Sequence, residues 1–272
     1  MQSLPTAGRW SVYIALAVLF AVACAFLAHW QFERNEERAA QLALVETNYD
    51  AEPIAWEQAL AQGRFDPAQE WLPVVMTGRY LEADQLVVRN RPHGGTSAFE
   101  VLTPLLTDEG GIVIVDRGWV RPADEGTGPA AIPAPPSGEV TVVARLRPSE
   151  PLPTSGRSAP EGQVPTIHLP VVATQTGDET ITSAYGILVS EDPAPADAPQ
   201  PLEAPTADPG PHLSYAIQWI LFAVMGFIFI FYVIRTETRH RHEDDEDTSA
   251  PGRRDRDADD EDAILDAAGP RR

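Results

Sequence analysis

The chain has 272 residues and a net charge of −20, because 40 acidic residues stand against 20 basic ones, all of them arginine. A surface this acidic argues against a nucleic-acid partner, since phosphate backbones bind basic surfaces. The single cysteine, Cys24, excludes an internal disulfide framework and any zinc or iron–sulfur site built from cysteines.

The first predicted element is a transmembrane helix. No Asp, Glu, Lys or Arg interrupts residues 10–30, and about 20 apolar residues suffice for a helix to cross a bilayer. A cleaved signal peptide or a lipid-modified Cys24 is the alternative. The apolar run continues past Cys24 through Leu27, which favours an uncleaved anchor. Beyond Trp30 we expect the helix to continue, now charged, to about Val45.

The middle segment, residues 31–191, changes to strand-like patterning. Its apolar residues alternate with a period of two, which is typical of β-strands. The predicted strands are 72–80, 85–90, 99–105, 111–120, 139–147, 164–169 and 180–190, preceded by a short helix at 56–62. With no amphipathic helix between them, these strands predict an antiparallel sheet or a small barrel.

Three further segments follow the predicted strands. Residues 192–211 hold seven prolines and predict an extended linker. Residues 212–234 form a second apolar run of spanning length. The mixed-charge tail, 235–272, is expected to be a disordered acidic segment.

The placement of arginines predicts the orientation of the two spans. Arg9 precedes the first span, and Arg235, Arg239 and Arg241 follow the second, whereas residues 32–234 hold 27 acidic and 11 basic residues. By the positive-inside rule, both termini lie in the cytoplasm and the central domain lies outside a bacterial plasma membrane. The predicted fold class is a two-span α-helical membrane protein with a mainly antiparallel β extracytoplasmic domain.

The sequence offers little for catalysis. His93, in the glycine loop RPHGGTS, is the nearest candidate for an enzymatic group, but a turn explains the glycines more simply. The neighbours Asp116 and Arg117 are expected to form an ion pair at a strand edge. No nucleophile with its base, paired carboxylates or metal motif is recognisable, so we predict that the protein is not an enzyme.

The more informative residues lie at the predicted membrane edge. His212, Tyr215 and Trp219 are spaced i, i+3, i+7, so one helix face carries all three. His29 lies at the outer end of the first span, at a similar depth in an antiparallel pair. Two such histidines could ligate a haem iron, since imidazole is a common axial ligand. The alternative is that both imidazoles simply favour the membrane interface, as tryptophan does.

Several short motifs, in order, resemble the surfeit-locus family of cytochrome c oxidase assembly factors. The resemblance covers about residues 10–235. The matching segments are WQ at 30–31, VMTGRY at 75–80, VVRNR at 87–91, FEVLTP at 99–104, VIVDRGWV at 113–120, GEVTV at 138–142, RLR at 145–147 and HLSYAIQW at 212–219.

The resemblance implies a membrane protein that helps to mature subunit I of haem-a-type terminal oxidases, with haem A as a transiently bound cofactor. The family histidine at the start of the second span matches His212, and the tyrosine that follows it matches Tyr215. We hypothesise that His212 is an axial ligand of the haem iron and that Tyr215 and Trp219 orient or shield the macrocycle. The expected partners are oxidase subunit I, haem A synthase and the lipid bilayer. The residues expected to dock the protein on subunit I are Gly78, Arg89, Arg91, Arg117 and Trp119; the alternative is that the arginines are ordinary charges on the strand surface.

The chain also departs from the family pattern. Acidic residues dominate 32–38, where the family is usually basic, and the proline-rich segment replaces the family's usual approach to the second span. The altered region 151–211 before the second span resembles the shortened actinobacterial members, and the arginine-only composition and acidic tail also suit an actinobacterium. His29 falls where the family has no histidine. A membrane-anchored scaffold or an extracytoplasmic binding module, with no cofactor, is the alternative function.

Overall fold

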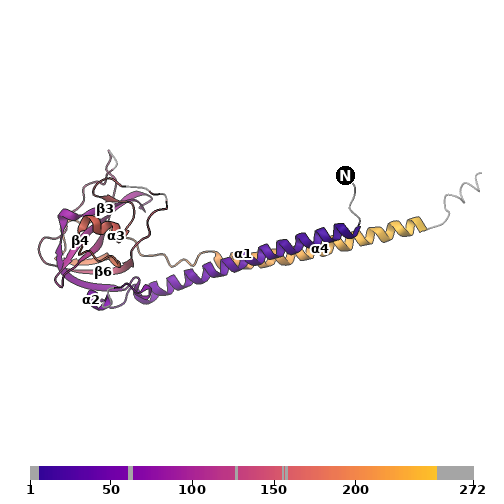
Figure 1. The fold of residues 1–272 in the computed structure, drawn as a ribbon, viewed down its shortest axis with the longest axis horizontal. Coiled ribbons are helices and arrows are strands. Elements are labelled where there is room, and N and C mark those ends of the chain that lie inside the picture. Colours follow the sequence, from indigo (N-terminus) through magenta and orange to yellow (C-terminus); the bar gives the residue numbers. More distant parts are fainter. Residues whose placement is uncertain (1–5, 61–63, 126–127, 155, 157–158, 250–272) are drawn as a thin grey trace, which may run out of the picture. The chain divides into compact units, whose positions relative to one another are not determined.

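A computed structural model describes residues 6–60, 64–125, 128–154, 156 and 159–249 (Figure 1). The chain forms two compact units. The helical unit combines residues 1–37 with residues 209–272, and the β unit comprises residues 38–208.

Two long helices dominate the helical unit. Helix α1 spans Thr6–Asn48 and α4 spans His212–Ser249. Each contains a segment long and apolar enough to cross a membrane, as the two apolar runs predict. Large apolar side chains point outward from the pair, and Phe26 is 71% exposed and Phe229 64%. Such a surface is costly in water and favourable in lipid, so it indicates membrane anchoring.

The two helices run side by side through small residues (Figure 1). Cys24, Ala28 and Ala216 are buried. Gly226 meets Phe20, and a Cβ atom at Gly226 would lie only 2.9 Å from the phenyl ring. Small side chains therefore let the helices approach closely, as is usual between helices in lipid.

Both helices extend beyond their apolar segments. Helix α1 continues to Asn48, which confirms the predicted charged extension. Helix α4 continues to Ser249, so residues 235–249 are helical and not disordered as predicted. Adding residues to an existing helix is much easier than nucleating one, and Arg and Glu are good helix formers. The rest of the predicted tail, 250–272, lies outside the described residues.

The β unit is built on eight strands. Their bounds are β1 Ile54–Ala55, β2 Pro73–Tyr80, β3 Leu86–His93, β4 Thr96–Thr107, β5 Ile112–Val120, β6 Val140–Pro148, β7 Gln163–Val164 and β8 Ala184–Asp192. The short helices are α2 Trp56–Ala59, α3 Leu169–Thr176 and the 3-10 turns η1 Pro67–Gln69 and η2 Glu82–Asp84. The strand order is β1-β2-β6-β8-β5-β4-β3-β7.

An additional pairing between β2 and β4 closes five of these strands into a small barrel. It joins Gly78–Tyr80 to Leu105–Thr107. Gly78 is required at this crossing, because a Cβ atom there would lie 2.2 Å from the carbonyl oxygen of Leu106. The closed ring places alternate side chains of each strand in a common interior.

The sheet is mixed, so the prediction of a mainly antiparallel domain was wrong. Strand β8 pairs antiparallel with β6 but parallel with β5, and the pairs β1–β2 and β3–β7 are also parallel. The predicted strand 164–169 is instead the two-residue β7 followed by α3. Leu169, Val172 and Thr176 are buried along one face of that helix. A short apolar run fits a strand or a buried helix equally well, and Pro170 suits a first helical turn.

The interior of the β unit is apolar. The largest cluster fills the ring around Val74, Met76, Leu105, Val115 and Val142, all at most 3% exposed. A second cluster packs α3 against β3, β4 and β5. This rigid core supports the polar side chains described next.

The end of α1 is fastened to the β unit by side-chain contacts. The amide of Asn48 donates to the carbonyl oxygens of Ala68 and Glu70, at 2.7 and 2.9 Å. The guanidinium of Arg145 lies 3.6 Å from the centre of the Tyr49 ring and donates from Nε to the Tyr49 carbonyl at 2.8 Å. The last turns of α1 therefore belong to the β unit.

Candidate functional site

His212 is the first residue of α4 and the best-placed ligand of the helical unit. The helix begins directly after Pro211, whose carbonyl accepts the Tyr215 backbone N–H at 3.0 Å. The imidazole is half-buried, and its Nδ1 atom lies 3.0 Å from Oε1 of Gln31 on α1. The Nε2 edge of the ring faces Gly210, where a Cβ atom would lie 3.6 Å from Nε2.

Tyr215 and Trp219 extend this site along α4. Tyr215 is 46% exposed, and Trp219 is half-buried with its ring edge-on to Phe222 at a centroid distance of 5.7 Å. The Nε2 atom of His212 has no hydrogen-bond partner among the described residues, and Tyr215 and Trp219 follow on the same face of α4. This arrangement fits what a haem needs: an axial nitrogen and a flat apolar surface.

The structure does not bring His29 to His212. The side chain of His29 is 73% exposed, and its Nδ1 lies 3.5 Å from Glu33. Gln31, two residues further along α1, makes the contact instead, and positions two apart lie on nearly opposite helix faces. Sequence reasoning overlooked Gln31 as a site residue, although the matched pair Trp30-Gln31 contained it.

Arg117 is buried in the β unit and does not lie on a docking surface. Its side chain is 0% exposed and pairs with Glu191 at 2.9 Å. Tyr80 donates to the other Glu191 oxygen at 2.8 Å, and burial together with this carboxylate raises the pKa of Tyr80. Arg117 therefore holds β5 to β8 from inside the domain.

The predicted pair between Asp116 and Arg117 was wrong. Adjacent residues of a strand point to opposite faces, and Asp116 instead accepts the backbone N–H of Gly118 at 3.1 Å. Burial is the main cause that holds the pKa of Asp116 well above its usual range, and repulsion from Glu100 is the second cause.

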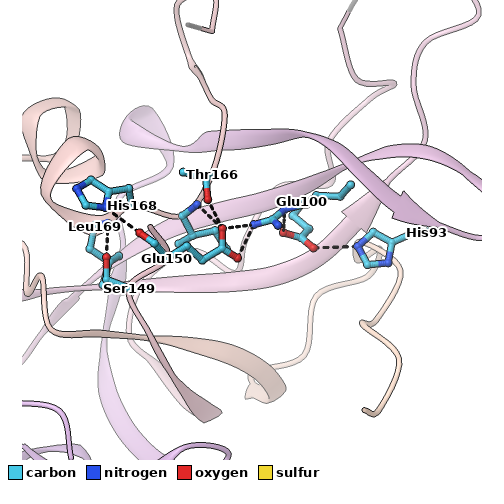
Figure 2. A network of polar contacts seen from close by, with 9 residues as sticks. His93, Glu100, Ser149, Glu150, Thr166, His168 and Leu169 are labelled. Atoms are coloured by element: carbon cyan, nitrogen blue, oxygen red, sulfur yellow. Dashed lines mark hydrogen bonds and ion pairs between the residues drawn. The ribbon is translucent and has the colours of Figure 1, made fainter. Parts of the chain in front are cut away.

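Arg91 links Glu100 and Glu150 in a second polar network. Figure 2 shows these two carboxylates, with His93 beside Glu100 and Thr166 beside Glu150. The Nε atom of Arg91 lies 2.7 Å from Glu100, outside hydrogen-bonding alignment, and its Nη2 donates to Glu150 at 2.7 Å. Glu150 also accepts from the Thr166 hydroxyl and from the Ile167 backbone N–H. Burial alone raises the pKa of Glu150, but these donors and Arg91 together hold it below the usual value.

His93 lies at one end of the Arg91 network. Its Nε2 is 2.9 Å from Glu100, and its ring stacks on Trp119 at a centroid distance of 5.6 Å. Thr96 contacts the backbone carbonyl of His93 and not its ring. The loop makes a tight turn with Gly94 and Gly95 at positive φ, and no described hydroxyl or thiol is positioned for His93 to activate.

Trp119 also fastens the proline-rich segment to the barrel. Its backbone exchanges two hydrogen bonds of 2.8 Å with Gln200. Gly118 has a φ of +117°, and a Cβ atom there would lie 2.2 Å from the Gln200 carbonyl oxygen. Arg38 binds the carbonyls of Thr206 and Asp208 at 3.0–3.1 Å. The segment is therefore attached to the domain at two places.

Arg89 is the docking candidate whose guanidinium makes no ion pair or hydrogen bond within the described part of the chain. It lines a cleft of about 690 Å³. The other lining residues are Asn90, Arg91, Pro151, Leu152, Pro153, Gly156, Pro165 and Thr166. Since Arg91 is neutralised by two carboxylates, Arg89 is the cation that the described residues of this cleft offer to a ligand.

The described residues hold no group of three or more His, Cys, Asp or Glu side chains that could bind a metal ion. The polar groups identified above among the described residues are a half-exposed imidazole on the helices, a buried Arg117–Glu191 pair, a half-buried Arg91 network and a cleft lined by Arg89.

Comparison with known proteins identifies the family. The model of the SURF1 family matches residues 18–224. A SURF1-like protein of Mycobacterium bovis, described as uncharacterised, is 36% identical over 222 residues, covering 79% of this chain and 80% of the relative. A SURF1-like protein of Mycobacterium tuberculosis matches equally. The cytochrome oxidase assembly protein SHY1 of Saccharomyces cerevisiae is 28% identical over 112 residues, covering 39% of this chain and 28% of that protein.

The chain belongs to the SURF1 family, because the family model covers most of its length and the mycobacterial relatives match across four-fifths of both chains. The resemblance to the surfeit-locus family drawn from the short motifs is thereby confirmed. The mycobacterial matches agree with the actinobacterial character of the sequence.

Proposed function

We propose that this SURF1-family member is a non-enzymatic assembly factor for a haem-a-type cytochrome c oxidase, and that it binds haem A and assists its insertion into subunit I. Family membership and the name of the yeast relative support the oxidase assignment. The observation that supports haem binding is the imidazole of His212, held through Nδ1 at the start of an apolar helix, with no hydrogen-bond partner for Nε2 among the described residues.

His212 would hold the haem iron, and Tyr215 and Trp219 would flank the macrocycle. Haem A supplies the redox-active iron porphyrin of the oxidase, so the task of this chain is to hold the group and release it. A half-exposed ligand at the end of a helix suits temporary binding, because a partner can reach it without unfolding the β unit.

In the same proposal, both termini lie in the cytoplasm and the β unit lies outside the plasma membrane. The excess of arginine at the cytoplasmic ends of the two apolar runs supports this orientation. It places His212 at the outer face of the bilayer, on the side of the β unit.

Arg89 would dock the protein on a partner. The guanidinium in the cleft suits a carboxylate, which it can bind through two parallel hydrogen bonds. Subunit I of the oxidase is the proposed partner, and haem A synthase is a second one. Arg91 and Arg117 contribute by stiffening the strands, and Trp119 by holding the proline-rich segment, whereas Gly78 serves barrel closure.

The test of haem binding is the visible spectrum and extractable haem of the detergent-purified protein from cells that make haem A. Wild type is expected to carry haem A, and His212→Ala is expected to lose it. His29→Ala is the matched control, since His29 is an exposed imidazole on α1, and it should keep the haem. A colourless wild type from such cells would overturn haem delivery and favour a cofactor-free scaffold.

The test of docking is oxidase activity in a deletion strain complemented with variants. Arg89→Ala is expected to reduce oxidase assembly while haem binding stays intact. Arg79→Ala, at an exposed arginine of β2, is the control and should complement fully. Full complementation by Arg89→Ala would refute the cleft as a docking site.

A further inference from the structure

Gln31 and His212 are distant in sequence but meet in the helical unit. They lie 181 positions apart, on α1 and α4, and their side chains are joined by one 3.0 Å contact between Oε1 and Nδ1. Gln31 is half-buried, whereas its neighbours Trp30 and Phe32 are exposed. The amide therefore points from α1 toward the first turn of α4.

The chemistry of the contact determines which nitrogen carries the proton. An amide oxygen has no hydrogen and can only accept, so Nδ1 of His212 must donate. A neutral imidazole has one N–H, and the lone pair is then on Nε2. Metal ions bind the unprotonated nitrogen. A hydrogen bond donated by the other ring nitrogen fixes the ring orientation of a metal-bound histidine.

Gly210 lies against the other edge of the ring. Its φ is +72°, and a Cβ atom there would lie 3.5 Å from Cδ2 and 3.6 Å from Nε2 of His212. A side chain at position 210 would therefore touch the edge that carries the nitrogen left with its lone pair by the Gln31 contact. The two contacts act on opposite edges of one ring.

We propose that Gln31 is a positioning residue that holds His212 in the Nδ1-protonated tautomer and aims Nε2 at the haem iron. This inference rests on the proposed function for the identity of the ligand. The tautomer itself belongs to the protein without haem, so it can be measured separately.

The first test is ¹⁵N nuclear magnetic resonance of histidine-labelled, haem-free protein in detergent, with His212→Ala used to assign the signal. Wild type is expected to show the Nδ1-protonated tautomer. Gln31→Leu, which removes the acceptor, should shift His212 toward the Nε2-protonated form. Gln31→Glu keeps an acceptor oxygen and should restore the wild-type signal.

The matched control is Gln218→Leu, which makes the same change at an exposed position of α4. It should leave the His212 signal as in wild type. An unchanged His212 signal in Gln31→Leu would overturn the inference, and the Gln31→Glu variant guards against an effect of misfolding.

The second test is a titration of the same proteins with haem A, followed by the haem absorption spectrum. Removing an outer hydrogen bond from a metal-binding histidine typically lowers affinity about 10- to 100-fold, so Gln31→Leu should bind more weakly by at least tenfold. Gln31→Glu and Gln218→Leu should bind within a few-fold of wild type, by the same principle.

The two proposals fail in different ways. If wild type shows the expected tautomer but binds no haem A, the proposed function is wrong and the positioning of His212 still stands as a structural fact. If wild type binds haem A and Gln31→Leu binds it equally well, the positioning role is wrong and the proposed function stands.

Discussion

The β unit and the helical unit hold their polar side chains in opposite ways. In the β unit, Arg91 and Arg117 each contact two or more groups: Arg91 contacts Glu100 and Glu150, and Arg117 contacts Glu191 and the Pro133 carbonyl. In the helical unit, the imidazole of His212 has one hydrogen-bond partner among the described residues, the side chain of Gln31. Multiple contacts around buried charges serve the fold, since an unpaired buried charge is very costly. A solitary contact on a half-exposed ring is the arrangement that the proposed haem ligand would need.

The largest loss of stability is expected when the buried cation of the β unit, Arg117, is removed. Arg117→Met leaves Glu191 buried without its partner, which should lower the free energy of unfolding by about 3–5 kcal/mol. The measurement is the urea midpoint of the detergent-purified chain. Arg79→Met, at an exposed arginine, should change it little, and an equal effect of both variants would contradict the role given to Arg117.

A smaller effect is expected where the proline-rich segment meets β5. Gly118→Ala forces a side chain into a positive-φ site and against the Gln200 carbonyl, at a cost of about 1–3 kcal/mol. The segment should detach, and a glutamate-specific protease should then cleave faster after Glu203. Gly128→Ala, where a Cβ atom would contact nothing, is the control. Unchanged cleavage in Gly118→Ala would show that the segment is held elsewhere.

The pH dependence of stability tests the burial of Asp116 in the β unit. Its pKa is raised in the folded protein by burial, so its contribution to stability is complete below the unfolded pKa, near 3.8, and is lost as pH rises through the higher folded pKa. Asp116→Asn mimics the protonated form and should raise the urea midpoint at pH 7 but not at pH 3.5. A midpoint lowered at pH 7 would mean that the carboxylate is needed in its ionised form.

The smallest effect on stability is expected in the helical unit. His212→Ala removes one contact of a half-exposed ring. It should change the free energy of unfolding, measured by urea, by less than about 0.5 kcal/mol. Its effect on haem binding should be large by comparison. A strongly destabilised His212→Ala protein would place this residue with Arg117, as part of the fold.

The parts of the fold that follow from local pattern could be predicted. The apolar runs at 10–30 and 212–234 correspond to segments of α1 and α4, and strands β2 to β6 lie within a few residues of the predicted ones. The pairing of β8 between β6 and β5 could not be predicted, because it depends on contacts between residues far apart in the sequence. The run 164–169 was predicted to be a strand because its period is ambiguous over so few residues, and the helix α3 that begins at Leu169 was not predicted.

The site was predictable in its residue types but not in its pairings. The interfacial position of His212 follows from the span, whereas the Gln31 contact depends on the rotation of both helices about their axes. Arg117 has the same charge as Arg89, and nothing in the local sequence distinguishes an arginine buried on Glu191 from one that lines an open cleft. Pairing partners such as Glu191, 74 residues from Arg117, are set by the barrel.

The closure of β2 onto β4 through Gly78 also bears on aggregation. Unpaired strand edges recruit other chains, and proteins commonly limit them by closing a barrel or shortening the outermost strands. Here the outermost strands of the sheet, β1 and β7, have two residues each, and the central strands are paired on both sides. The two ends of the sheet therefore offer foreign strands little backbone to pair with, apart from the part of β3 beyond Val88, since β7 pairs only with Val87 and Val88.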